Sequence, residues 1–216
     1  MVRIKIYRNE RRIQLKQIKQ IKLSPRERLV KYLIENKNPL SILNLSGSAV
    51  MDYKNTYNIV NELQPEIISQ EKIGNTNLIR LKLVPNPNIY SVENKRTEEF
   101  LLKYPKLKIV KTYAEELNYP FLIALVYGSY VKKTNTESSD IDVCIISDNK
   151  EVIKELQEKL GLLSLKLEIH EFTSKEFISM IEKSQNNLGH EIVKNNVILY
   201  GIENYYNLIS KWMKKE

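Results

Sequence analysis

A glycine–serine pair followed by two closely spaced aspartates constrains this chain more than any other feature. The apolar run 121–127 ends at Gly128 and Ser129, a polar segment follows, and a second apolar run opens with Asp140 and Asp142. This pattern predicts a strand, a turn with a short helix, and a second strand. Residues two apart share one face of a strand, so the two aspartates should point to the same spot.

Two carboxylates that point to one spot repel each other, and a cation between them relieves the repulsion. Mg²⁺ prefers oxygen ligands and often binds carboxylates and phosphate oxygens together. Gly128 allows close approach of the backbone, and the Ser129 hydroxyl and the following amides can donate hydrogen bonds to phosphate. The stretch therefore predicts a metal and phosphate site, the alternative being a plain βαβ turn with solvated acids.

In this stretch the sequence resembles the nucleotidyltransferase superfamily typified by DNA polymerase β, and most closely its small minimal members. The resemblance covers residues 105–205 and includes the late run 191–201, where family members often place a helix, a turn and a Leu-Tyr pair. The family spacer commonly reads Gly-Ser-x-Ala-Arg-Gly, whereas this chain has Val131, Lys132 and Lys133 after Tyr130. The resemblance implies a mixed sheet flanked by helices.

The resemblance also implies roles for individual residues. Its third carboxylate usually lies on a strand that corresponds to the predicted strand 165–172, where Glu168 is the matching position. His170 shares that face, so Glu168, His170 or neither completes the site. The implied metal is Mg²⁺ or Mn²⁺ and the implied nucleotide is a nucleoside triphosphate, expected to be ATP. The metal ligands and catalytic residues would be Asp140, Asp142 and Glu168, and the triphosphate would be held by Gly128, Ser129, Lys132 and Lys133.

An earlier segment, residues 23–84, predicts three helices followed by a hairpin. Ser24-Pro25-Arg26-Glu27 is typical of a helix start, with a serine cap, proline in the first turn and a capping-box glutamate. Further helices are expected at 40–45 and 52–63, with a turn at 46–48 between them, and strands at 67–73 and 78–83.

This order resembles the winged helix-turn-helix family of DNA-binding domains. Helical spacing places Tyr57 among the inward residues of 52–63. The resemblance makes 52–63 the recognition helix, with Thr56 among the residues that face the nucleic acid. The implied nucleic-acid contacts are Tyr53, Lys54, Asn55, Thr56 and Asn58 on the helix and Lys72, Asn75, Asn77 and Arg80 on the wing.

The formal net charge of +8 is concentrated near the amino terminus. Residues 1–22 carry eight basic side chains against one glutamate, and their alternation of apolar and charged residues predicts a hairpin. Such an excess indicates an acidic partner, most often DNA or RNA, although a solvated basic arm has the same composition. The arm residues expected to contact nucleic acid are Arg3, Lys5, Arg8, Arg11 and Arg12.

The 216 residues accommodate two small domains joined by a linker at 85–91, where two prolines disfavour regular structure. The predicted fold class is α+β or α/β, with a basic arm at 1–22, a winged helix at 23–84 and a nucleotidyltransferase domain at 92–216. No apolar run is long enough to span a membrane and the start does not resemble a signal peptide, so we expect a cytoplasmic protein with no membrane partner.

Together these observations predict a metal-dependent enzyme that transfers a nucleoside monophosphate to an acceptor. The acceptor stays open: an RNA end, a small molecule or a protein hydroxyl. Minimal family members are often paired with a small helical toxin protein, which makes such a toxin a candidate partner, and a homodimer is a further expectation. The alternative is a DNA-binding transcriptional regulator or antitoxin with a catalytically silent transferase fold, which the altered spacer favours.

Overall fold

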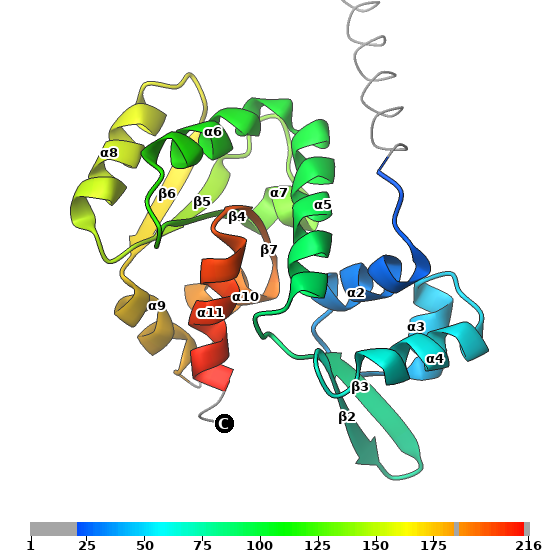
Figure 1. Ribbon diagram of the computed structural model, residues 1–216. Coiled ribbons are helices and arrows are strands. Elements are labelled where there is room, and N and C mark those ends of the chain that lie inside the picture. The colour runs from blue at the N-terminus through cyan, green and yellow to red at the C-terminus, as the bar shows by residue number, and fades with distance from the viewer. Residues whose placement is uncertain (1–20, 184–185, 214–216) are drawn as a thin grey trace, which may run out of the picture.

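Three helices and a small antiparallel sheet form the first part of the chain, up to residue 84 (Figure 1). The computed structural model describes residues 21–183 and 186–213, so the hairpin expected within 1–22 falls almost entirely outside the described residues. The sheet has the strand order β1-β3-β2. The elements are α2 (Pro25–Glu35), β1 (Leu40–Ser41), α3 (Ile42–Ser48), α4 (Tyr53–Leu63), β2 (Ile68–Ile73) and β3 (Thr76–Leu81).

The start of α2 confirms the predicted capping box. The Ser24 hydroxyl accepts from the Glu27 backbone at 3.2 Å, and the Ser24 backbone donates to the Glu27 carboxylate at 2.9 Å. This exchange satisfies two amide groups that have no partner inside the helix. The apolar stripe of α2 then turns inward, with Leu29 and Leu33 fully buried.

Three local expectations for this part were wrong. The second helix begins later than 40 and continues through residues 46–48, because Ser41 caps it and Leu40–Ser41 pair with β3 as a strand. Thr56 is fully buried and its hydroxyl donates to the Asp52 carbonyl at 2.9 Å, so it cannot face a partner. Tyr57 is instead 46% exposed and stacks beside Tyr53.

A four-stranded mixed sheet with the order β6-β5-β4-β7 forms the centre of the second part (Figure 1). Strands β5 and β6 are parallel, and the other neighbours are antiparallel. One face packs against α6 and α8, and the other packs against α9, α10 and α11. The elements are α6 (Lys108–Leu117), β4 (Ile123–Tyr127), α7 (Gly128–Lys132), β5 (Ile141–Ile146), α8 (Lys150–Gly161), β6 (Leu167–Phe172), α9 (Ser174–Ile181), α10 (Leu188–Lys194), β7 (Asn196–Tyr200) and α11 (Ile202–Met213).

Helix α5 (Pro87–Lys103) connects the two parts, followed by a short 3-10 turn at Pro105–Leu107. The helix begins inside the expected 85–91 linker, because Asn86 caps it and proline suits its first position. It packs against α2 on one side and against β7 and α11 on the other. No helix within residues 21–183 and 186–213 is long and apolar enough to cross a membrane.

Buried polar groups fix α5 against the sheet. Arg96 forms a buried ion pair with Glu93, and its Nη2 donates to the Asn196 carbonyl at 3.0 Å. The Tyr206 hydroxyl donates to Glu93 at 2.7 Å. A buried charge pair is tolerated only when its remaining hydrogen-bonding capacity is used, and these partners from β7 and α11 use it.

Candidate active site

The turn between β4 and α7 brings the backbone of Gly128 against the carboxylate of Asp142. Gly128 has a φ of +68°, a conformation that disfavours side chains. A Cβ atom at this position would lie 2.0 Å from Asp142 Oδ2. Glycine is therefore required here for two independent reasons, and one of them is the neighbouring carboxylate itself.

Asp142 lies on β5 and receives a hydrogen bond from the Ser129 backbone. Its pKa is raised above the ordinary range, first by burial and then by the negative charges of Glu168 and Glu191. The hydrogen bond from Ser129 and the nearby His170 act in the opposite direction. The carboxylate therefore lies in an environment with an excess of negative charge, although Ser129 orients it.

Glu168 pairs with Asp142 in the parallel register of β5 and β6. Its side chain is exposed, and its Oε1 lies 3.7 Å from His170 Nε2. His170 Nδ1 lies 2.8 Å from the hydroxyl of the buried Tyr127. Burial and then the charge of Asp142 raise the pKa of Tyr127, so its hydroxyl stays protonated and able to donate to His170.

Asp140 lies one residue before β5, with an exposed side chain. Its charge contributes to the raised pKa of Tyr130, after burial and Tyr104. The structure thus places Asp142 and Glu168 side by side on paired strands, with Asp140 just before the start of β5. Among the described residues, no three His, Cys, Asp or Glu side chains form a ready-made metal cluster.

The two spacer lysines have different surroundings. Lys132 Nζ lies 2.5 Å from Glu191 Oε1, so this ammonium is already paired. Lys133 adopts a left-handed conformation with a φ of +61° at the end of α7, and its side chain is exposed. Of the two, Lys133 is the more available for a phosphate.

The residues expected to contact nucleic acid are exposed where the structure describes them, except for the buried Thr56 and the half-buried Asn55. Lys54 and Asn58 are exposed on α4, and Lys72 and Arg80 are exposed on the β2–β3 hairpin. Asn55 is half-buried, and its backbone donates to the Asp52 cap at 2.8 Å. The expected contacts Arg3, Lys5, Arg8, Arg11 and Arg12 lie outside the described residues.

Several residues at the site were not predicted from the sequence. The sequence shows Tyr127 only as part of an apolar strand, yet its hydroxyl lies 2.8 Å from His170 Nδ1. Glu191 was noted only within the late run 191–201, yet its charge affects Asp142 and it pairs with Lys132. Its position 49 residues after Asp142 gives no local signal, because only the tertiary fold brings Glu191 of α10 to Lys132 of α7.

Residues 108–205 match the sequence model of the family described as polymerase beta, nucleotidyltransferase. The match includes β4, α7, β5, β6 and β7, and thus every strand of the second sheet. It supports the nucleotidyltransferase superfamily for this part of the chain, and with it an enzymatic activity. Polymerase β-like nucleotidyltransferases generally use divalent metals.

A relative from Methanocaldococcus jannaschii, named as a putative protein adenylyltransferase, is 29% identical over 97 residues. The aligned region covers 43% of this chain and 70% of that protein. The relative therefore agrees with transfer of a nucleoside monophosphate in general.

We predict that Gly128→Ala destabilises the protein more than Gly74→Ala does. Both glycines have positive φ, but a Cβ at Gly74 meets nothing within 4 Å, whereas one at Gly128 meets Asp142. The excess cost should be about 1–3 kcal/mol, as for overpacking, measured by urea unfolding. In an Asp142→Ala background the excess should shrink; equal costs for the two glycines in the wild-type background would contradict the contact.

We also predict that Asp142→Asn stabilises the protein at neutral pH. The raised pKa means that the native state holds the Asp142 proton more tightly than the unfolded state. This contribution is present at acidic pH and is lost as pH rises through the native pKa. Urea unfolding should show wild type losing stability relative to Asp142→Asn over that range. Asp148→Asn, at an exposed position outside the site, is the control, and parallel pH curves for wild type and Asp142→Asn would refute the prediction.

Proposed function

We propose that the protein is a metal-dependent nucleotidyltransferase that moves a nucleoside monophosphate from a nucleoside triphosphate, ATP in our proposal, to an acceptor. The observation that carries this proposal is the Gly128–Ser129 turn packed directly against Asp142, with Glu168 beside it on the next strand. The turn follows β4, the acids lie on the neighbouring strands β5 and β6, and all three fall within the matched region 108–205.

The donor set fits a divalent cation. No Lys or Arg in the described chain forms an ion pair with Asp142 or Glu168, and their mutual repulsion contributes to the raised pKa of Asp142. We propose Asp142 and Glu168 as ligands of Mg²⁺ or Mn²⁺, with Asp140 as a third from its exposed position. When bound, the cation supplies charge stabilisation at the transferred phosphoryl group.

The residues of the chain itself would bind and orient the triphosphate. The Ser129 backbone already donates to Asp142, so its hydroxyl is the group available to a phosphate oxygen. Gly128 keeps the turn free of any side chain, and Lys133 offers an unpaired charge from the end of α7. In the reaction, a bond forms between the acceptor oxygen and the α-phosphorus as the bond to the leaving pyrophosphate breaks.

We propose three classes of acceptor: an RNA end, a small molecule and a protein hydroxyl. The name of the Methanocaldococcus relative refers to a protein acceptor, which favours a protein hydroxyl. A small helical toxin protein is the partner we propose within that class. Assembly as a homodimer is likewise a proposal.

A second candidate function arises from the first part of the chain. We propose that residues 23–84 form a winged helix that binds DNA or RNA through α4 and the β2–β3 hairpin. The order of three helices and a hairpin supports this, as do the exposed Lys54, Lys72 and Arg80. With a silent transferase region the protein would be a transcriptional regulator or antitoxin.

Label transfer tests the enzymatic proposal. Incubation with α-³²P ATP, Mg²⁺ and separate RNA and protein acceptor pools should label an acceptor. The Asp140→Asn/Asp142→Asn double variant should lower transfer by more than about 100-fold, since even supporting residues of metal ligands can cost that much. Asp148→Asn should transfer as wild type does. Equal labelling by wild type and the double variant would refute the enzyme.

Binding to DNA that survives the double variant and is lost on Lys54→Gln/Arg80→Gln would favour the regulator instead. Both substitutions change exposed side chains, so the fold should be retained.

A further inference from the structure

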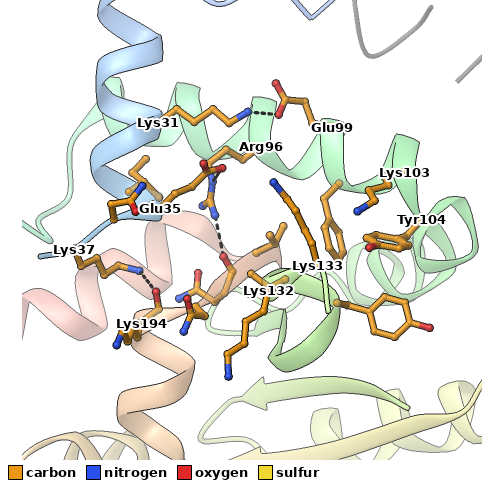
Figure 2. A pocket seen from close by; sticks show the side chains of 18 residues that line it. Lys31, Glu35, Lys37, Arg96, Glu99, Lys103, Tyr104, Lys132, Lys133 and Lys194 are labelled. Carbon is orange, nitrogen blue, oxygen red and sulfur yellow. Dashed lines mark hydrogen bonds and ion pairs between the residues drawn. The ribbon is translucent and has the colours of Figure 1, made fainter. Parts of the chain in front are cut away.

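A pocket with a volume of about 570 Å³ lies where the two parts of the chain meet. It is bounded by the carboxyl-terminal half of α2, the second half of α5, α7, and the junction of α10 and β7 (Figure 2). Its size falls within the range of small-molecule sites in proteins. It borders the candidate active site at the end of α7 opposite the Gly128 turn, where Lys133 is part of its lining.

Positive charge dominates the lining. The residues that line the pocket include seven basic side chains and only two carboxylates, Glu35 and Glu99. Figure 2 shows Lys133 extending across the middle of the pocket toward α5, whereas Lys132 extends away from it. The basic residues are Lys31, Lys37, Arg96, Lys103, Lys132, Lys133 and Lys194.

The carboxylates near this pocket are already engaged with some of these groups. Glu99 pairs with Lys31, and Glu35 lies 3.4 Å from Arg96. Within the described ranges 21–183 and 186–213, no carboxylate forms an ion pair with Lys103, Lys133 or Lys194. Like charges gathered without partners attract an anion strongly, because a concave site concentrates their field.

Lys37 ties the two parts of the chain together at this pocket. Its ammonium donates to the Val193 carbonyl at 2.5 Å and to the Lys194 carbonyl at 3.2 Å, at the end of α10. Burial, and then the charge of Arg96, lower the pKa of Lys37 to about 8. The charge of Arg96 therefore already acts on Lys37. The hydrogen bonds from Lys37 hold the segment after α2 against the end of α10, and both segments line the pocket.

Aromatic rings form another wall. The rings of Phe100 and Tyr104 lie 4.9 Å apart and those of Tyr104 and Tyr130 lie 5.0 Å apart, measured between centroids. The Tyr104 hydroxyl donates to the Asn135 side chain at 2.9 Å, which fixes the central ring. Aromatic faces beside cations are the combination that binds nucleotides, since bases stack on rings while phosphates meet the charges.

We propose that this pocket binds a nucleotide through its phosphate groups and its base, either as a free nucleotide or as part of a single strand. The site is additional to the proposed triphosphate site at Gly128 and Ser129, and its occupancy does not depend on transfer activity. Tyr130 lies in α7 between Gly128 and Lys133 and lines the pocket, so the pocket and the candidate active site share this short helix.

Fluorescence anisotropy with a fluorescein-labelled oligoadenylate, and competition by unlabelled ATP, tests the proposal. The measurement is made in EDTA, which removes divalent metal. Lys103→Gln/Lys194→Gln removes two charges that have no carboxylate partner among the described residues, although Lys103 Nζ lies 4.8 Å from the centroid of the Tyr104 ring. The change should weaken binding about tenfold or more. Lys103→Arg/Lys194→Arg should retain binding. Circular dichroism establishes that both variants fold.

Two controls separate the pocket from other sources of affinity. Lys154→Gln/Lys166→Gln removes the same charge from exposed positions elsewhere and should bind as wild type does. Ser129→Ala alters the candidate active site and should leave the direct binding of the oligoadenylate unchanged, although it can weaken ATP at the proposed triphosphate site. An equal loss in either control, or the absence of any binding, would overturn the proposal. ATP binding that responds to Lys103→Gln/Lys194→Gln identifies a free nucleotide, whereas a response for the oligoadenylate alone identifies a strand.

Discussion

The contact between the Gly128 backbone and the Asp142 carboxylate is the constraint on which the candidate active site depends. It is possible only because Gly128 lacks a side chain and adopts a positive φ, which turns the chain from β4 into α7. The same turn directs the Ser129 amide at Asp142. An acid that would otherwise be destabilised by burial and by Glu168 is thereby held in one place. The geometry concentrates negative charge where a cation and a triphosphate would meet.

The buried network around Arg96 positions whole helices and strands, as the contact between Gly128 and Asp142 positions the side chains of the site. It fixes α5 to β7 and α11, while the outer face of the same helix carries Glu99 and Lys95, which pair with Lys31 and Glu27 of α2. One helix therefore positions both the first part of the chain and the basic pocket relative to the sheet. The matched region 108–205 and residues 23–84 are linked through packing on this helix, so a ligand in the pocket would contact both parts of the chain.

The parts of the fold and of the candidate site that depend on neighbouring residues in the sequence could be predicted. The capping box at Ser24 and the Gly-Ser and Asp-x-Asp spacing specify their elements through neighbouring residues alone. Glu168 was placed correctly on the strand beside β5, but its register with Asp142 depends on strand pairing. Glu191, Tyr127 and the pocket lysines depend on contacts between distant segments, which composition and periodicity do not reveal. Thr56 is buried and Tyr57 is exposed, the reverse of the prediction, because the buried face of α4 is rotated relative to the face that the sequence pattern predicts.

Binding of Mn²⁺, followed by electron paramagnetic resonance in the presence of a non-hydrolysable ATP analogue, tests the central claim most directly. The account predicts that the wild-type protein binds Mn²⁺ and that Asp142→Asn loses this binding, while Lys154→Gln retains it. Retained binding with an unchanged spectrum in Asp142→Asn would contradict the assignment of the Gly128–Asp142 site as the metal and triphosphate centre.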